Sequence, residues 1–204
     1  MKVALIGASG NVGSRILAEL LVRRHEVTGI VRHPEKLRPH VGLTVKRGDV
    51  NDESKLAQIL AGHAAVISSV KFQSIEPRSL IEAVKKAGVK RLLVVGGAGS
   101  LEVSPGVQLV DTPDFPEAYK PEALAGRDFL NVLRREWDLD WTFLSPSALF
   151  VPGERTGKFR LGTDRLLVGS GGESKISMED YAIALVDELE TPRHPRQRFT
   201  LGYW

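Results

Sequence analysis

The chain has no cysteine among its 204 residues. Disulfide cross-links and thiolate chemistry are therefore excluded, and the composition is compatible with a reducing compartment. The histidines, at positions 25, 33, 40, 63 and 194, show no paired metal-ligand spacing. We therefore expect no metal centre.

Long apolar runs and an excess of one charge are also absent. No stretch reaches the length of a membrane span, and no charged-then-apolar leader precedes Val3, so we expect a cytoplasmic protein without a membrane partner. The net charge is only +3, with both signs interspersed. This pattern is not a nucleic-acid footprint, although the isoelectric point of about 9.2 leaves that class open.

The first thirteen residues, MKVALIGASGNVG, contain the most informative pattern in the chain. An apolar run over 3–6 is typical of a strand buried on both faces of a parallel sheet. Gly7, Gly10 and Gly13 follow at a three-residue interval, and apolar residues then recur at helical spacing. The sequence therefore predicts a strand, a glycine-rich turn and a helix.

Such a turn is suited to binding a dinucleotide. It presents backbone N–H groups and the positive end of a helix dipole to a pyrophosphate, and a Cβ on Gly7 or Gly10 would hold the backbone too far from the ligand. Gly13 would let the helix pack closely on its strand. The alternative is a tight turn without a ligand, but its place in the first βα unit favours dinucleotide binding.

Arg32 directly follows a predicted second strand over 26–31, nineteen residues beyond Gly13. In a dinucleotide fold, an acid here selects NAD, whereas an arginine accommodates the 2′-phosphate of NADP. Neither Val31 nor His33 is acidic. We therefore predict a preference for NADPH over NADH, with a solvated surface arginine as the alternative.

Strands and helices alternate through the rest of the first 145 residues. We expect further strands over 43–46, 64–69, 91–95 and 141–144, with helices over 52–60, from 77, and from 121 to about 137. This order predicts an α/β protein, a Rossmann-type doubly wound parallel sheet forming one domain over 1–204. The core would cover about 1–145 and a smaller substrate-side cap about 146–204.

Two stretches of this chain are expected to be irregular, and two elements are expected near its end. Residues 101–116 and 148–174 lack periodicity, and the first stretch is typical of a lid or binding loop. Ser177 and Asp180 form a predicted capping box for a last helix. The alternation over 198–203 predicts a strand with one buried side.

Ligands of open parallel sheets bind at the carboxyl ends of the strands. Asp49 could accept the adenine amino group there or form a turn, and 68–70 should lie beside the cofactor. Residues 96–100, GGAGS, leave room for a flat ring, with a flexible loop as the alternative. Ser100 in this stretch is a candidate hydrogen-bond partner for substrate.

The stretches GASGNVG, VRHPEKL, VVGGAGSL, WTFLSPSALFVPGERTGKFRLG and ISMEDYA resemble bacterial NAD(P)H-binding proteins known as NADH-flavin reductases. These are atypical short-chain dehydrogenases, near the biliverdin reductase B and flavin reductase group and the NmrA-like proteins. The resemblance covers nearly the whole chain and implies cofactor contacts at the following residues: Gly7, Ala8, Ser9, Gly10, Asn11, Val12, Gly13, Arg32, Asp49, Val50, Ser68, Ser69, Val70, Gly96, Gly97, Ala98, and Pro146 beside the nicotinamide.

The sequence departs from the wider dehydrogenase pattern Tyr-x-x-x-Lys, in which a lysine one helical turn away lowers the pKa of the tyrosine. The fourth residue after Tyr119 is Ala123, and the fourth after Tyr181 is Leu185. Carbonyl reduction, which needs a proton on the developing alkoxide, therefore loses support. Hydride transfer to an oxidised flavin depends less on a protein acid.

We therefore predict an NADPH-dependent reductase of a flavin- or quinone-like small molecule, with Ser100 and Tyr119 as candidate catalytic residues. One alternative is a non-enzymatic NADP-binding redox sensor, like the NmrA group, that acts through a protein partner. A carbonyl reductase or epimerase remains open if Tyr119 or Tyr181 reaches the nicotinamide. The sequence leaves a homodimer open.

Overall fold

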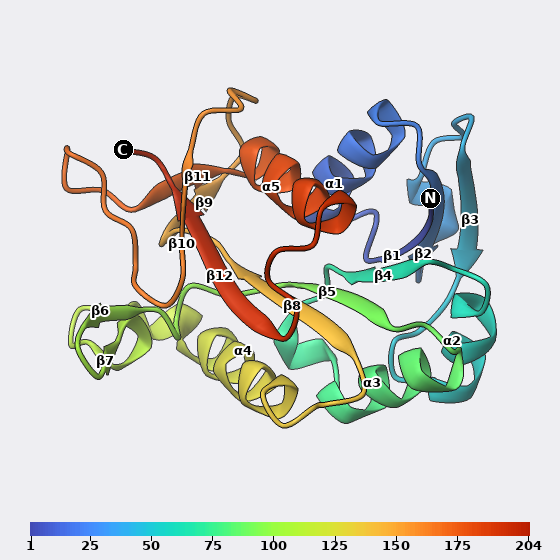
Figure 1. Ribbon diagram of the computed structural model, residues 1–204, viewed down its shortest axis with the longest axis horizontal. Coiled ribbons are helices and arrows are strands. Elements are labelled where there is room, and N and C mark those ends of the chain that lie inside the picture. Colours follow the sequence, from blue (N-terminus) through green and yellow to red (C-terminus); the bar gives the residue numbers. More distant parts are fainter.

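The computed structural model describes residues 1–204, which form one eight-stranded sheet with helices on both faces (Figure 1). The strand order is β10-β12-β8-β5-β4-β1-β2-β3, and all neighbours are parallel except β10, which runs antiparallel to β12. The strands are β1 (Lys2–Ile6), β2 (Glu26–Val31), β3 (Leu43–Arg47), β4 (Ala65–Ser68), β5 (Arg91–Val95), β8 (Asp140–Ser145), β10 (Arg160–Gly162) and β12 (Gln197–Gly202).

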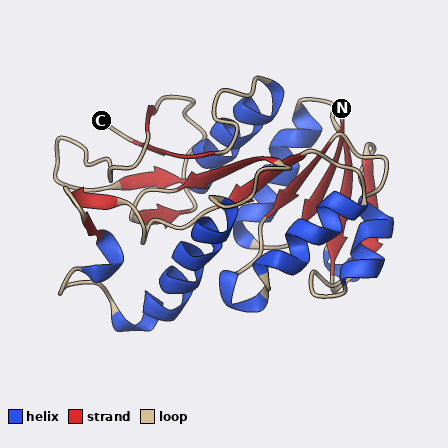
Figure 2. Ribbon diagram, turned by 60° about the horizontal axis from the view of Figure 1, so that its bottom comes forward, coloured by secondary structure: helices blue, strands red, loops and turns tan.

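Helices cover the sheet above and below, as Figure 2 shows. The helices are α1 (Asn11–Val22), α2 (Glu53–Leu60), α3 (Pro77–Lys86), α4 (Lys120–Leu133) and α5 (Met178–Glu190). Alternate residues of β1 point to opposite faces of the sheet, so Val3 and Leu5 join the core between the sheet and helices α1 and α5. Ala4 and Ile6 join the core between the sheet and helices α2, α3 and α4. The Rossmann-type α/β fold predicted from the sequence is confirmed.

The two stretches expected to be irregular contain short elements. A hairpin occupies part of the first, and short strands lie within and after the second. Helix α4 ends at Leu133, earlier than predicted, and Trp137 is exposed. The short elements are β6 (Glu102–Ser104), β7 (Val107–Gln108), β9 (Leu149–Val151), β11 (Lys175–Ser177) and the 3₁₀ turns η1 (Pro34–Lys36), η2 (Phe72–Ser74), η3 (Leu109–Asp111) and η4 (Glu117–Tyr119).

The prediction that the last strand has one buried side was wrong. All residues of β12 after Gln197 are buried, so both faces of the strand are covered, with Phe199 and Leu201 in the core on the side of α1 and α5. Its polar side chains are buried with partners: Thr200 donates to the carbonyl of Ser145 at 2.8 Å, and Arg198 is only 6% exposed. Alternation in the sequence predicted the strand but not the hydrogen-bond partners that allow its polar face to be buried.

Helix α5 begins at the predicted cap. The Ser177 hydroxyl accepts the Asp180 N–H at 3.0 Å. The carboxylate of Asp180 does not accept the Ser177 N–H, as it would in a capping box. It accepts the N–H groups of Thr156 and Gly157 and the Thr156 hydroxyl, all from a preceding loop, and also the hydroxyl of Tyr203. The helix start therefore also anchors the chain over 156–157.

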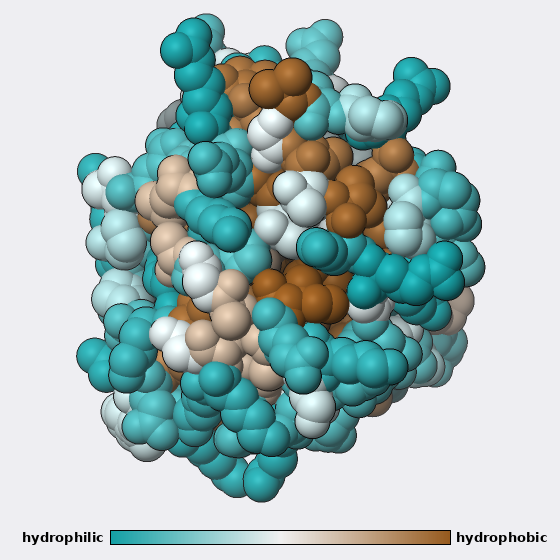
Figure 3. Space-filling view, turned by 90° about the vertical axis from the view of Figure 1, so that its right-hand side faces the viewer, coloured by the Kyte–Doolittle hydropathy of each residue, from teal (hydrophilic) through white to brown (hydrophobic).

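Strand β3 forms one edge of the sheet. The side of the molecule that carries it faces the viewer in Figure 3, where apolar side chains gather near the centre of a largely hydrophilic face. Leu43 and Val45 are half-buried, whereas Lys46 and Arg47 are exposed. Charges at an edge oppose pairing with a further strand.

None of the helices combines the length and hydropathy that a membrane crossing requires.

Candidate functional site

The glycine turn joins β1 to α1 at the point where the strand order reverses. Gly7 has φ of +82°, and a Cβ there would lie 2.1 Å from the Ser69 carbonyl oxygen. A Cβ on Gly13 would lie 1.9 Å from the Gly7 carbonyl oxygen. Both positions therefore require glycine because backbone approaches them closely, and the loop after β4 touches the turn.

The start of α1 is open to an anion. Its capping residue, Gly10, offers no side chain, and the first turn contains no acid. Because the first N–H groups of a helix have no acceptor within the helix, they and the helix dipole favour a negatively charged ligand. These features fit the pyrophosphate of a dinucleotide.

A cavity of about 320 Å³ adjoins this turn. It brings together residues from the carboxyl ends of β1, β2, β3 and β4, including most of the adenosine-side residues singled out in the sequence. The residues lining it are Ile6, Gly7, Ser9, Gly10, Ile30, Val31, Arg32, Gly48, Asp49, Val50, Asn51, Ser69, Val70, Lys71 and Ser74. The predicted residues that do not line it are Ala8, Asn11, Val12, Gly13, Ser68, Gly96, Gly97, Ala98, Ser100, Tyr119 and Pro146.

Two exposed cations lie in this cavity. The side chains of Arg32 and Lys71 form no ion pair or hydrogen bond within the protein. The acid of the lining, Asp49, accepts the Asn51 N–H at 2.9 Å, which is the turn-forming role considered for it. Lys71 was missed in the sequence, where only its position just beyond a predicted strand exit could have indicated it.

The carboxyl ends of β5 and β8 lie next along the sheet. A Cβ on Gly96 would lie 2.4 Å from the Phe143 ring, so this glycine is required by packing between the strands. A Cβ on Gly97 would meet only Phe72, at 3.7 Å. Of these two glycines, which were expected to leave room for a flat ring, Gly97 has space for a Cβ and Gly96 does not.

Ser100 is buried, at 3% exposed, and is held by Arg198 of β12. The guanidinium donates to the Ser100 hydroxyl at 3.0 Å and carbonyl at 3.3 Å, to the Ser145 hydroxyl at 3.3 Å, and to the Asp164 carboxylate at 3.1 Å. Burial lowers the pKa of Arg198, and the ion pair with Asp164 opposes that shift. Arg198 thus links the ends of β5 and β8 to the segment around Asp164.

Neither candidate tyrosine forms a tyrosine–lysine pair. Tyr119 is 68% exposed, and Ala123, four residues on, packs against Gly99. Tyr181 is fully buried and donates to the Leu144 carbonyl at 2.7 Å, and burial raises the pKa of its hydroxyl far above the ordinary value.

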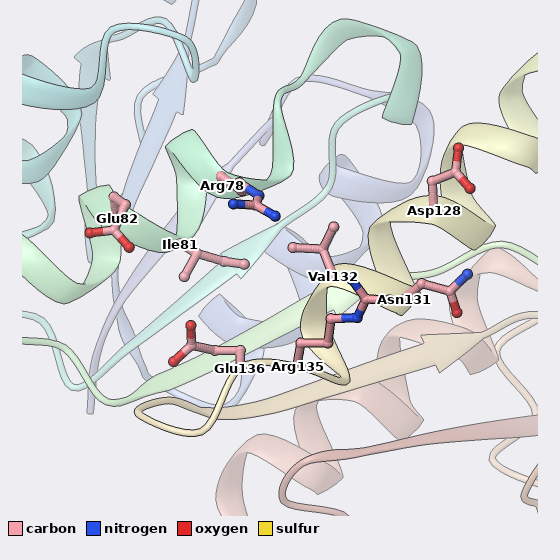
Figure 4. Close-up of a pocket in the computed structure, with 8 residues that line it drawn as sticks. All are labelled: Arg78, Ile81, Glu82, Asp128, Asn131, Val132, Arg135 and Glu136. Atoms are coloured by element: carbon pink, nitrogen blue, oxygen red, sulfur yellow. The ribbon is translucent and has the colours of Figure 1, made fainter.

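A larger cavity, of about 580 Å³, lies elsewhere, between α3 and α4 (Figure 4). Charged side chains of both signs border it, including Arg78, Glu82, Asp128 and Arg135. It contains no glycine turn and no strand end. The smaller cavity is therefore the better candidate for a nucleotide.

The fold and the glycine turn define a dinucleotide-binding protein of the Rossmann class. The profile of the NAD(P)H-binding family matches residues 7–192, and the chain belongs to that family.

Three solved structures are similar over almost their whole length. A "putative exported protein" from Burkholderia pseudomallei is 50% identical, with full coverage of both chains and a TM-score of 0.90. A "putative epimerase" from Bacteroides thetaiotaomicron is 47% identical over 99% of this chain and 96% of its own, with a TM-score of 0.95. A "putative NADH-flavin reductase" from Streptococcus pneumoniae is 38% identical, with full coverage of both chains and a TM-score of 0.87.

Proposed function

We propose that this protein is an NADPH-dependent reductase that transfers hydride to a flavin- or quinone-like acceptor. The observation that carries the proposal is the cavity that joins the open start of α1 to the unpaired cation of Arg32. The name of the Streptococcus pneumoniae relative supports the same class of reaction.

When bound, the nicotinamide supplies the hydride. The chain's residues would bind the cofactor through its phosphates. The turn Gly7–Gly13 would hold the pyrophosphate, and Arg32 would pair with the 2′-phosphate. Asp49–Val50 and Ser68–Val70 border the adenosine half. Gly96–Ala98 and Pro146 would lie beside the nicotinamide, and Gly97, where a Cβ would meet only Phe72 at 3.7 Å, would leave the approach of a flat acceptor open.

Following absorbance at the nicotinamide band tests this proposal, with NADPH mixed with FMN or with a quinone. We expect oxidation of NADPH that depends on the acceptor and is slower with NADH. Absence of turnover with every flavin and quinone contradicts the reductase. Tight NADPH binding without turnover, together with a co-purifying protein, instead supports a redox-sensing regulator.

The Tyr119→Phe variant distinguishes hydride transfer to a flavin from carbonyl chemistry. Because water can neutralise the negative charge that hydride transfer leaves on a flavin, no protein acid is needed, and the variant should keep its flavin or quinone turnover. If the unmodified protein instead acted on an aldehyde or a sugar, and the variant lost that activity with unchanged NADPH binding, Tyr119 would be the proton donor. That outcome would favour a carbonyl reductase or epimerase, the latter being the name of the Bacteroides relative.

A further inference from the structure

The loop that follows β4 forms one wall of the cofactor cavity, with Val70, Lys71 and Ser74 in its lining. Of these, Lys71 is the charged residue, and its ammonium is exposed with no carboxylate partner. A lysine that lines a cavity without an internal partner is available for an anionic ligand.

Two side chains from other elements fix this loop. The carboxylate of Glu122, in the first turn of α4, accepts the N–H of Phe72 at 2.6 Å and that of Gln73 at 3.0 Å. At the other end, Asn51 donates to the Ser74 carbonyl at 2.9 Å and accepts the Glu76 N–H at 3.3 Å. The backbone on the carboxyl side of Lys71 is therefore anchored by helix α4 and by the loop that follows β3.

The position of this loop indicates which phosphate the ammonium meets. In the strand order β4-β1-β2, Lys71 after β4 and Arg32 after β2 flank the glycine turn on opposite sides. The loop also touches the turn, where a Cβ on Gly7 would lie 2.1 Å from the Ser69 carbonyl oxygen. The pyrophosphate binds at the glycine turn, and the 2′-phosphate binds at the end of β2.

We propose that Lys71 binds the pyrophosphate of the dinucleotide, with Glu122 and Asn51 as positioning residues for its loop. This inference rests on the proposed dinucleotide site and deepens it. Arg32 sets the choice between NADPH and NADH, whereas Lys71 strengthens the binding of both because both contain the pyrophosphate.

The test measures the Kd of NADPH and of NADH by nicotinamide fluorescence for the unmodified protein, Lys71→Met and Lys71→Arg. Since a charge-assisted hydrogen bond is lost, Lys71→Met should weaken both cofactors about tenfold and leave their ratio unchanged. Lys71→Arg keeps the charge and should retain most of the affinity. Lys90→Met is the matched control, because Lys90 is exposed at the amino end of β5, away from the cavity.

Three results would overturn the proposal. Equal affinities for Lys71→Met and the unmodified protein would show that Lys71 does not meet the cofactor. Weakening of NADPH alone would assign Lys71 to the 2′-phosphate, and equal weakening in Lys90→Met would indicate only the general charge of the protein. If the unmodified protein bound neither cofactor, the proposed function itself would fail, which the first two results do not imply.

Discussion

Among single residues, Arg32 offers the most direct measurement because NADPH and NADH differ only in the 2′-phosphate. Its exposed guanidinium should give NADPH about a tenfold advantage in Kd, the lower end of the range for a charge-assisted contact. Arg32→Asp should reverse the preference, since the carboxylate repels the phosphate and accepts from the ribose hydroxyls. Fluorescence titrations with both cofactors measure the change.

Arg38→Asp is the control for this variant, because Arg38 is exposed, follows Arg32 by six residues in the chain and does not line the cavity. It makes the same change in charge and should leave the preference for NADPH in place. Equal affinities of the unmodified protein for both cofactors would show that Arg32 has no part in the choice.

Gly13 is sensitive for a steric reason. The Cβ of Gly13→Ala would lie 1.9 Å from the Gly7 carbonyl oxygen, so α1 must move away from β1. We expect a loss of about 3 kcal/mol in the free energy of unfolding and weaker binding of NADPH. Urea melts compare it with Gly171→Ala, whose Cβ meets open space; similar losses in the two variants would refute the steric argument.

The side chains that complete the site were harder to predict than the glycines. Gly7 and Gly13 are visible in the sequence because backbone contact tolerates no other residue and their spacing is local. Arg198 reaches Ser100 only because β12 inserts beside β8, and Lys71 reaches the cavity only because distant Glu122 and Asn51 fix its loop. Contacts between residues so far apart in the chain produce no spacing pattern that the sequence alone could show.

Among the elements, the start of α5 has a stability that depends on pH. Burial raises the pKa of Asp180, but hydrogen bonds from Thr156, Tyr203 and Gly157 outweigh it, and the pKa is lower than its ordinary value. The ionised form is thus favoured in the folded protein. Its contribution is complete above the ordinary pKa of about 3.9 and is lost as the pH falls through the lowered folded-state value.

Asp180→Asn should therefore lower the free energy of unfolding by about 2 kcal/mol at neutral pH, the scale of hydrogen bonds to a charged group. The difference from the unmodified protein should shrink as the pH is lowered below about 4, through the lowered folded-state pKa. Urea melts across this range measure it, with Asp128→Asn on the exposed face of α4 as the control. A difference that is constant with pH would mean that the charge of Asp180 contributes nothing.

The elements themselves were largely predictable. The strands 26–31 and 91–95 begin and end where the sequence placed them, because short segments rich in Val, Ile and Leu between turn residues are typical of buried parallel strands. The short strands β9 and β10 were missed, since three residues are too few to show a period.

For the whole molecule, β12 holds together two parts of the sheet. It pairs with β8 on one side and is the sheet partner of β10 on the other. A chain ending at Arg196 should therefore lose its cooperative unfolding transition and its binding of NADPH. Circular dichroism melts would compare it with a chain that lacks only Trp204, which is 66% exposed; a cooperative melt of the shorter chain would contradict this role.

The place of β12 also has a consequence for synthesis on the ribosome. The residues that line the cavity beside the glycine turn lie between Ile6 and Ser74, so they leave the exit tunnel early. Strand β10 cannot join the sheet before β12 has emerged, because it pairs with that strand. The hydrogen bond from Arg198 to Ser100 also forms only then. Because a domain generally folds as a unit, the glycine turn and its cavity leave the tunnel early but reach their stable form only when β12 has emerged and entered the sheet.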